Sequence, residues 1–379
     1  MSQSCRAIVA YQPSNKQPDF RLEDVSIRDI EPDECLVDIV ATGVCHTDLG
    51  VASRPDSIYP RVLGHEGSGY IRKIGSKISL NLQEGDPVLL SIAFCNNCPS
   101  CQSGHPSYCY SAYALNFANP GRDTYQARSV GTEQDFVVAG GFFGQSSLGS
   151  LAIVKESCIV SVAGAVKSRS ELQLFAPLGC GFQTGAGTVS KLGKAQPGDS
   201  VAIIGLGGVG LSAVMAARII GCKHIVAVDR IHDRLALAKE LGATDVIHTG
   251  KLDTASLAEA VRNATDGLGS SLTIDTTGVL SIIREALEMT SILGRMVLLG
   301  MSKESIDIDM TKFKLAGKTL LGSVQGDVIP SQYIAQMIEW YRAGRFPIDK
   351  LVRFYKPEDI GPALHDMGTG QTVKPIILW

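Results

Sequence analysis

The chain has 379 residues, of which 45% are hydrophobic and 19% charged, and its formal net charge is -3 at pH 7. These values are ordinary for a globular protein of two or three domains and give no sign of a nucleic-acid or membrane partner. The opening MSQSCRAIVAYQ lacks the basic start and apolar run of a secretory signal. Four of the ten cysteines crowd together at metal-ligand spacing, which favours a reducing compartment over a disulfide framework. We therefore expect a cytoplasmic location.

The first part of the chain, residues 1–180, is rich in glycine and in turn signals. Short β-like runs recur along it, such as ECLVDIVATGV, GYIRKIG, GDPVLLSIAF and EQDFVVAG. Runs of this length between turn residues are typical of strands joined by long loops. The pattern predicts a β-rich domain.

A first group of metal-ligand side chains comes from three places in the sequence. Cys45 and His46 stand in CHTD, His65 and Glu66 in GHEG, and Cys180 in PLGCGFQTGAG. CHTD and GHEG are Cys45-His46-Thr47-Asp48 and Gly64-His65-Glu66-Gly67. Thiolate and imidazole are ligands that Zn²⁺ prefers, and a catalytic zinc takes three protein ligands and keeps a fourth position open. Taken singly, a buried core cysteine or a turn histidine is the simpler interpretation. The combination favours a catalytic zinc.

A second set of cysteines has the spacing C-x2-C-x2-C-x7-C, formed by Cys95, Cys98, Cys101 and Cys109. Four thiolates at such spacing indicate a closed, tetrahedral structural zinc, with a disulfide or an iron–sulfur site as the weaker alternatives. Structural zinc is worth about 10 to 16 kcal/mol, so this lobe should not order without metal. The other cysteines have apolar neighbours and are expected to be buried: Cys5, Cys35, Cys158 and Cys222.

From residue 181 to residue 325 strands alternate with helices, which predicts a doubly wound parallel sheet. The stretch SVAIIGLGGVG at 200–210 reads as a buried strand that enters a turn and then a helix. Gly205, Gly207 and Gly210 have G-x-G-x-x-G spacing, which suits a tight turn, a close approach of backbone to a pyrophosphate and close helix packing. The alternative for this motif alone is a glycine-rich structural turn.

The second strand of this part, HIVAVDR, ends at Asp229 and supports dinucleotide binding. A carboxylate there accepts hydrogen bonds from ribose hydroxyls and repels a 2′-phosphate, which predicts NAD over NADP. Arg230 and Arg234 could offset part of this repulsion. The tail, residues 326–379, holds one helix and the strand-like VKPIILW and is too short for a domain, so we assign it to the first one.

With GVCHTD, GHEGSG, the four-cysteine loop, PLGCG and GLGGVG, the chain resembles the zinc-dependent medium-chain alcohol dehydrogenases over nearly its whole length. The resemblance implies an α/β protein with a GroES-like catalytic domain and a Rossmann NAD-binding domain. It implies one catalytic zinc on Cys45, His65 and Cys180 and one structural zinc on the four-cysteine loop. It also implies catalytic roles for Thr47 and Glu66, with Asp48 orienting the His65 ring. The implied cofactor contacts are His46, Thr184, Gly205, Gly207, Gly208, Val209, Gly210, Asp229, Arg234 and Lys374.

The activity implied is reversible oxidation of a primary alcohol to its aldehyde by hydride transfer to NAD. FFGQSS and PLGCGFQTGAG resemble the aryl-alcohol (benzyl-alcohol) branch, and Ser91, four residues before Cys95, leaves room for a ring that Phe142 could contact. The alternative is that Phe142 and Phe143 are ordinary core residues. Gly50 stands where many relatives have a relay histidine, so the proton must leave by another route. The resemblance also implies a homodimer, with a tetramer as the alternative.

Three rival functions remain open from the sequence. The first is a reductase of the same fold without catalytic zinc, of the quinone or enone type, which leaves the three metal-ligand residues unexplained. The second is a zinc-dependent reductase of a carbonyl intermediate in secondary metabolism. The third is a non-catalytic nucleotide-binding protein.

Overall fold

The structure is a computed structural model that describes residues 2–14, 17–118, 121–128, 135–251 and 256–379. The chain forms two compact units. The first consists of Met1–Cys180, Ile329–Glu339 and Ile348–Trp379, and the second of Gly181–Val328 and Trp340–Pro347. None of the helices in the described ranges combines the length and apolar character needed to cross a membrane.

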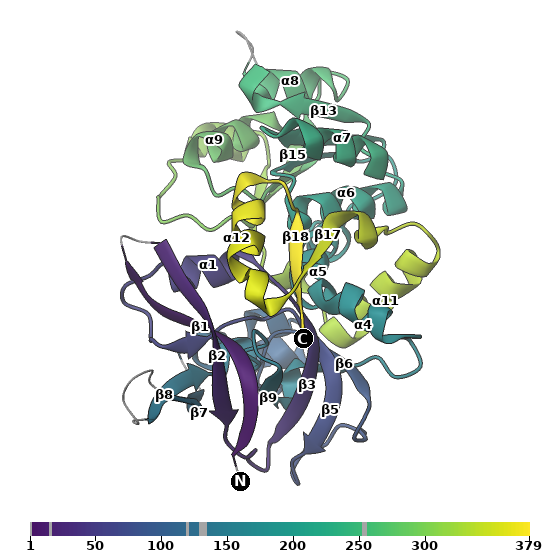
Figure 1. Cartoon of the computed structure of the whole chain (residues 1–379). Helices are drawn as coiled ribbons and strands as arrows, with labels where there is room; N and C mark the ends of the chain where they lie inside the picture. The colour runs from purple at the N-terminus through teal and green to yellow at the C-terminus, as the bar shows by residue number, and fades with distance from the viewer. Residues whose placement is uncertain (1, 15–16, 119–120, 129–134, 252–255) are drawn as a thin grey trace. The chain divides into compact units, whose positions relative to one another are not determined.

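The first unit is built on a closed barrel and a mixed sheet (Figure 1). The barrel order is β1 (Gln3–Ser14), β2 (Gln17–Ile27), β7 (Gly121–Arg128), β8 (Asp135–Gly140) and β4 (Arg61–Val62). The sheet order is β10 (Ile159–Ser161), β6 (Pro87–Leu90), β5 (Gly67–Ile74), β3 (Glu34–Gly43), β18 (Lys374–Leu378) and β17 (Val352–Tyr355), and β9 (Leu151–Lys155) also pairs with β3. The sequence prediction of a β-rich first part is therefore confirmed.

Strand β3 lies at the centre of this sheet and is buried along nearly its whole length. Its run of valine, isoleucine, leucine and alanine suits a strand with both faces covered. At its end, Gly43 pairs with Ile376 of the antiparallel strand β18, so the C-terminal segment joins the first unit's sheet. In Figure 1 the yellow strand β18 belongs to the same sheet as the purple strand β3. This register brings Lys374 close to Val44, which becomes important for the site.

Short helices connect the strands of the first unit. They are α1 (His46–Ala52), α2 (Pro99–Gln102), α3 (Ala112–Asn116), α4 (Arg169–Phe175) and α12 (Ile360–Thr369), with 3₁₀ turns at Pro106–Tyr108, Phe142–Gly144, Glu156–Cys158, Ala176–Gly179, Ile348–Leu351 and Pro357–Asp359. Helix α11 (Pro330–Arg342) begins in this unit. Helix α4 begins at a serine N-cap, because Ser168 Oγ accepts from Glu171 N and satisfies a free helix donor.

The second unit contains a parallel sheet with strands β13, β12, β11, β14, β15 and β16 in that order. The strands are β11 (Ser200–Ile204), β12 (His224–Asp229), β13 (Asp245–His248), β14 (Ser270–Asp275), β15 (Thr290–Leu298) and β16 (Thr319–Gly322). The helices are α5 (Gly181–Gly187), α6 (Gly208–Ile220), α7 (His232–Leu241), α8 (Leu257–Asn263), α9 (Leu280–Met289) and α10 (Met310–Leu315), with a π-helix at Thr188–Leu192 and 3₁₀ turns at Thr249–Lys251 and Gln325–Asp327. The predicted doubly wound architecture is confirmed.

The glycine-rich turn follows β11 and leads into α6. Gly205 has a φ of +88°, a conformation that favours glycine. A Cβ on Gly210 would lie 1.9 Å from Gly205 O, so the close packing predicted for the third glycine is present. Gly207 has nothing within 4 Å of its Cβ position, so the backbone there is open to a ligand.

Residues 340–347 differ from the expectation that the whole tail returns to the first domain, because they pack with the second unit. Arg345 Nη2 donates to Ile219 O at the end of α6, and the Trp340 and Phe346 rings lie 5.9 Å apart. Helix α11 therefore begins in the first unit and ends in the second. Sequence periodicity could not show this division, because one helix carries both contacts.

Candidate functional site

The first metal-ligand cluster consists of Cys45, His65, Glu66 and Cys180, whose ligand atoms all lie within 4.8 Å of one another. Cys45 is the N-cap of α1, His65 and Glu66 precede β5, and Cys180 follows the 3₁₀ turn at Ala176–Gly179. All four belong to the first unit. The structure thus brings together the three residues expected to hold a catalytic zinc, with Glu66 beside them.

Asp48 fixes the orientation of the His65 ring. Asp48 Oδ1 lies 3.0 Å from His65 Nδ1 and also accepts from Gly64 N, while Oδ2 accepts from Cys45 N. Nδ1 is therefore a donor nitrogen, and in the neutral ring the lone pair is on Nε2. Among the described residues Nε2 is buried with no hydrogen-bond partner. A buried acceptor beside two thiols fits a zinc ligand, which would satisfy it.

The charges in this cluster shift its pKa values strongly. A hydrogen bond from Cys180 is the largest influence that holds the pKa of Cys45 well below its usual range, and the charges of Lys374 and His65 act in the same direction. Burial opposes the charged form of His65, but Asp48 and Cys45 outweigh it and raise the pKa of the imidazole. Zinc takes a thiolate and a neutral imidazole, so its binding would release the proton that these interactions hold on the ring.

Glu66 is buried beside the ligands and is paired with a lysine from the other end of the chain. Lys374 Nζ donates to Glu66 Oε1 at 2.9 Å and to Val44 O at 3.0 Å. A Cβ on Gly43 would lie 2.1 Å from Glu66 Oε2, so the carboxylate occupies space that only glycine leaves. Burial raises the pKa of Glu66, and Lys374 opposes that shift.

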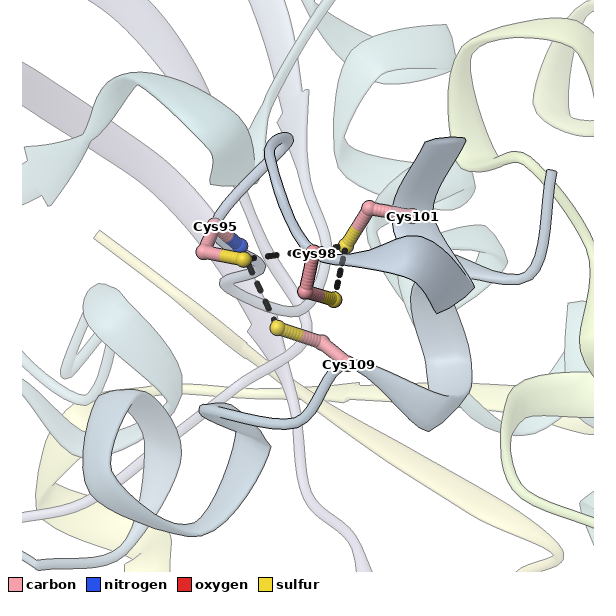
Figure 2. A group of neighbouring side chains, drawn as sticks. All are labelled: Cys95, Cys98, Cys101 and Cys109. Atoms are coloured by element: carbon pink, nitrogen blue, oxygen red, sulfur yellow. Dashed lines mark hydrogen bonds between the residues drawn. The ribbon is translucent and has the colours of Figure 1, made fainter. Parts of the chain in front are cut away.

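The second cluster is the four-cysteine loop shown in Figure 2. The four sulfur atoms lie within 4.8 Å of one another, with 3.5 Å between Cys98 and Cys101 and 4.0 Å between Cys95 and Cys101. A tetrahedral zinc with Zn–S bonds of about 2.3 Å requires sulfur atoms about 3.8 Å apart. The arrangement fits a closed zinc site, and all four cysteines are free of disulfides.

Backbone N–H groups support the thiolates of this loop. Cys95 N donates to Cys109 Sγ at 3.3 Å, as the dashed line in Figure 2 marks. Hydrogen bonds from the backbone of Tyr110 and Cys101 lower the pKa of Cys98 to about 6. Asn96 has a φ of +61°, which turns the chain so that Cys95 and Cys98 face one centre.

Comparisons with known proteins agree with this geometry. Residues 31–167 match the family described as alcohol dehydrogenase GroES-like domain, and residues 208–343 match zinc-binding dehydrogenase. A geraniol dehydrogenase of Castellaniella defragrans is 37% identical over 360 residues, which is 94% of each chain. The chain belongs to the zinc-dependent medium-chain alcohol dehydrogenases.

Two crystal structures are similar to this dehydrogenase over its whole length. An alcohol dehydrogenase zinc-binding domain protein from Burkholderia ambifaria has a TM-score of 0.90 at 38% identity, covering 100% of this chain and 99% of that one. The benzyl alcohol dehydrogenase of Acinetobacter calcoaceticus has a TM-score of 0.88 at 38% identity, covering 99% of each chain. The predicted family, the GroES-like and Rossmann fold class and zinc-dependent alcohol oxidoreduction are thereby confirmed.

The expected cofactor residues of the dehydrogenase lie in both units. In the second, a Cβ on Gly185 would meet Val209 O at 1.9 Å, so the helix that carries Thr184 packs directly on the glycine-rich turn. Asp229 accepts from Leu206 N at 2.7 Å, and its other oxygen accepts from Arg230 N and Ile231 N. The carboxylate therefore supports the phosphate-binding turn itself, which the sequence did not predict.

The remaining cofactor residues have differing surroundings. Gly208 is the first residue of α6, and Arg234, on α7, has a buried Nε without a hydrogen-bond partner among the described residues. In the first unit His46 is exposed at the start of α1. Lys374, which the resemblance implies as a cofactor contact, pairs with Glu66 in this structure. The cofactor roles of these residues stay predictions.

The dehydrogenase has an aromatic cluster on His65 that sequence reasoning found only in part. The His65 ring stacks on Phe143 at 4.5 Å and meets the edge of Phe142 at 5.6 Å. Phe117 contacts both phenylalanines and remains 38% exposed, whereas Phe142 has no exposed surface. The sequence around Phe117 does not predict this contact, because α3 and the Phe142–Gly144 turn meet only in the folded structure.

A buried glutamine connects the histidine to the second predicted pocket residue. Gln145 Nε2 donates to His65 O and to Ser91 O, and its Oε1 accepts from Gly67 N. Ser91 is buried, and its hydroxyl donates to Gly179 O at 2.7 Å. The motif FFGQSS contains this glutamine, but its partners are 54 to 80 residues away, so the sequence could not identify its role.

Proposed function

We propose that this dehydrogenase interconverts benzyl-type or other bulky primary alcohols and their aldehydes, with NAD as the hydride carrier. The observation that carries the proposal is the aromatic cluster on the metal-ligand histidine. Phe143 stacks on His65, and the half-exposed Phe117 ring lies 4.9 Å from Phe143. An aromatic wall of this kind favours a substrate ring by about 0.5 to 1.5 kcal/mol beyond the area buried. Phe142, fully buried, would support the wall from behind.

The small side chain of Ser91 leaves space for a bulky substrate. It is a small side chain four residues before Cys95, and its hydroxyl is held by Gly179 O. An aromatic residue there would occupy the space that we assign to the substrate. The names of two relatives, geraniol dehydrogenase and benzyl alcohol dehydrogenase, support an alcohol larger than ethanol.

The metal and the residues around it would divide the chemistry. When bound by Cys45, His65 and Cys180, zinc supplies a Lewis acid that lowers the pKa of a hydroxyl, as it lowers that of water from about 15.7 to about 7. Thr47 Oγ1 lies 3.7 Å from Cys45 Sγ, where its hydroxyl could accept the substrate proton. Gly50 has no side chain to pass the proton on, so we infer that water carries it to solvent. Bound NAD would supply the nicotinamide ring that accepts the hydride from the alcohol carbon.

Assembly and location form part of the proposal. We infer a homodimer, with a tetramer as the alternative, which is supported by the exposed apolar side chains of Ile292, Leu293 and Leu315 in the second unit. Light scattering at micromolar concentration tests this directly, and a monomer would contradict it. We infer a reducing compartment such as the cytoplasm, because six of the ten cysteines are placed to bind metal and none of the ten forms a disulfide in this structure.

The deciding experiment compares alcohols in an NADH-formation assay. We expect kcat/KM for benzyl alcohol to exceed that for ethanol at least tenfold, because a phenyl ring buries additional apolar area at about 25 cal/mol per Å². Ser91→Phe should shrink this ratio, while Ser302→Phe, at an exposed position of the second unit, should leave it unchanged. A better rate with ethanol, or an unchanged ratio in Ser91→Phe, would refute the substrate assignment.

A further inference from the structure

Arg61, on strand β4, is a buried arginine for which the described part of the chain offers no carboxylate partner. Its side chain is 3% exposed, and Nε and Nη2 are buried with no hydrogen-bond partner among the described residues. Nη1 donates only a long bond of 3.3 Å to Ser57 Oγ. Burying an unpaired charge costs several kcal/mol, so proteins rarely keep one without a use for it.

The groups around the guanidinium do not neutralise it at close range. Strand β4 pairs with Val9 and Ala10 of β1 and with Ala139 of β8, which are apolar. The titratable groups that interact with it are Tyr59 and Asp48. The Tyr59 hydroxyl donates to Val51 O and Arg54 O, and Asp48 is bound to His65. Burial lowers the pKa of Arg61 to about 10, which still leaves it charged at neutral pH.

Arg61 is connected to the metal-ligand cluster through one aromatic ring. Its guanidinium carbon lies 5.2 Å from the centre of the Phe142 ring, and that centre lies 5.6 Å from the His65 ring centre. The guanidinium is therefore within about 11 Å of the His65 ring. The Phe142 ring between them has no exposed surface, and a charge in buried protein is poorly screened.

With a divalent ion held by Cys45, His65 and Cys180, the two thiols would bind as thiolates. Together with Asp48 and Glu66 they would give four negative charges. Lys374 and the ion would supply three positive charges, which would leave one negative charge for Arg61 to balance. We propose that Arg61 is the positive charge that neutralises this centre and thereby favours the negative charge that forms on the substrate oxygen. The inference rests on the function proposed above.

Arg61 does not touch the reacting atoms, so it is a positioning residue that acts through its field. At an effective dielectric near 20, a unit charge about 11 Å away changes the equilibrium constant for forming a second unit charge by about tenfold. Loss of Arg61 should therefore make deprotonation of the substrate hydroxyl harder and move the acidic limb of the kcat profile up by about one pH unit. The same loss removes repulsion towards a divalent ion and should tighten its binding.

The test compares Arg61→Met with Arg61→Lys, which keeps the charge, and with Arg72→Met, which removes an exposed arginine of the same unit. Two readouts are used: the kcat–pH profile for benzyl alcohol, and the Zn²⁺ dissociation constant of the cluster from chelator competition. We expect Arg61→Met to raise the apparent pKa by about one unit and to bind Zn²⁺ up to about tenfold more tightly. In Arg61→Lys and in Arg72→Met, the pH profile and the Zn²⁺ dissociation constant should both stay near the wild-type values.

Opposite outcomes overturn the inference. Weaker Zn²⁺ binding in Arg61→Met with an unchanged pH profile would mean that Arg61 only supports packing. Arg61→Gln is a second neutral variant, and an unchanged pH profile together with an unchanged Zn²⁺ affinity in it would also overturn the inference. If the wild type itself oxidises no alcohol, the proposed function fails instead. In that case the chelator measurement on Arg61→Met still decides whether the charge acts on the metal.

Discussion

Lys374 and Glu66 form a buried ion pair of 2.9 Å although 308 positions separate them in the chain. The register of β18 on β3 makes this possible, because Ile376 pairs with Gly43 and brings Lys374 to the end of β3, next to Val44. Glu66 in turn occupies the space over Gly43. The last strand of the chain therefore completes the electrostatic surroundings of the metal-ligand cluster.

Breaking this pair should be costly. We expect Glu66→Gln to lower the free energy of unfolding of the first unit by about 3 to 5 kcal/mol, because Lys374 would remain charged and buried. The double variant Glu66→Gln/Lys374→Met should recover part of the loss. Guanidinium chloride unfolding of zinc-loaded protein measures both. Asp19→Asn, which breaks the exposed pair with Arg21, is the control and should cost under about 1 kcal/mol. Additive losses in the double variant would argue against the coupling.

Asp48→Asn should weaken zinc binding by about 10- to 100-fold, because it removes the charge that fixes the His65 ring and increases its basicity. The asparagine side chain can still accept from Gly64 N or Cys45 N, so the fold should persist. Competition with a chromogenic chelator gives the dissociation constant. Asp38→Asn, at an exposed pair with Arg72, is the matched control. Equal affinities for wild type and Asp48→Asn would show that the Asp48 contact has no role in metal binding.

The two clusters should respond differently to loss of one cysteine. We expect two zinc ions per chain in the wild type. Cys98→Ser should give aggregated or poorly folded protein, since structural zinc contributes about 10 to 16 kcal/mol. Cys180→Ser should fold, bind NAD and be inactive. Metal analysis, circular dichroism and an activity assay separate these outcomes, and an active Cys180→Ser variant would remove it from the catalytic site.

Asp229 should select against NADP. A 2′-phosphate about 4 Å from this carboxylate would meet a repulsion of roughly 4 kcal/mol per charge pair, or about a thousandfold in affinity. Asp229→Asn keeps one acceptor oxygen for the turn and removes the charge, so the NAD/NADP ratio of kcat/KM should fall. Asp233→Asn, fully exposed on α7, should leave the ratio as in the wild type. Similar use of both cofactors by the wild type would contradict the prediction.

Ionisation of Glu34 should make the free energy of unfolding depend on pH in the acidic range. Burial opposes its charged form, but hydrogen bonds from Arg28, Glu31 N and Lys155 lower its pKa from 4.5 to about 2. A lowered pKa in the folded state means that the stabilisation is complete above about pH 5 and is lost as the pH falls from 4.5 towards 2. Glu34→Gln should therefore cost about 2 to 3 kcal/mol at pH 7 and little near pH 2. Unfolding at several pH values tests this, with the exposed Glu31→Gln as control. A cost that does not change with pH would contradict the ionic explanation.

Most of the fold and the local chemistry could be predicted from the sequence. The alternation of strands and helices in residues 181–325, the four-cysteine loop and the turn at Gly205 depend on residues near one another in the chain. Their spacing therefore carries the information. The structure shows why that spacing is needed. At position 210, for example, any Cβ would lie 1.9 Å from Gly205 O, so only glycine fits. Cys180 was already a candidate third ligand from its place in PLGCGFQTGAG, and the family resemblance then implied its role.

Only the tertiary structure decided which distant residues meet around the cluster. The Lys374–Glu66 pair depends on strand register, Gln145 on the packing of a buried turn against two strand ends, and Arg61 on a ring that no short motif connects to it. A lone arginine in the run YPRVLGHEG looks like an exposed residue, since the sequence alone does not reveal its burial. The periodicity of hydrophobic residues and the spacing of metal ligands depend on residues that are near one another in the sequence. The balance of buried charge is a long-range property, because it sums over side chains that only folding brings together.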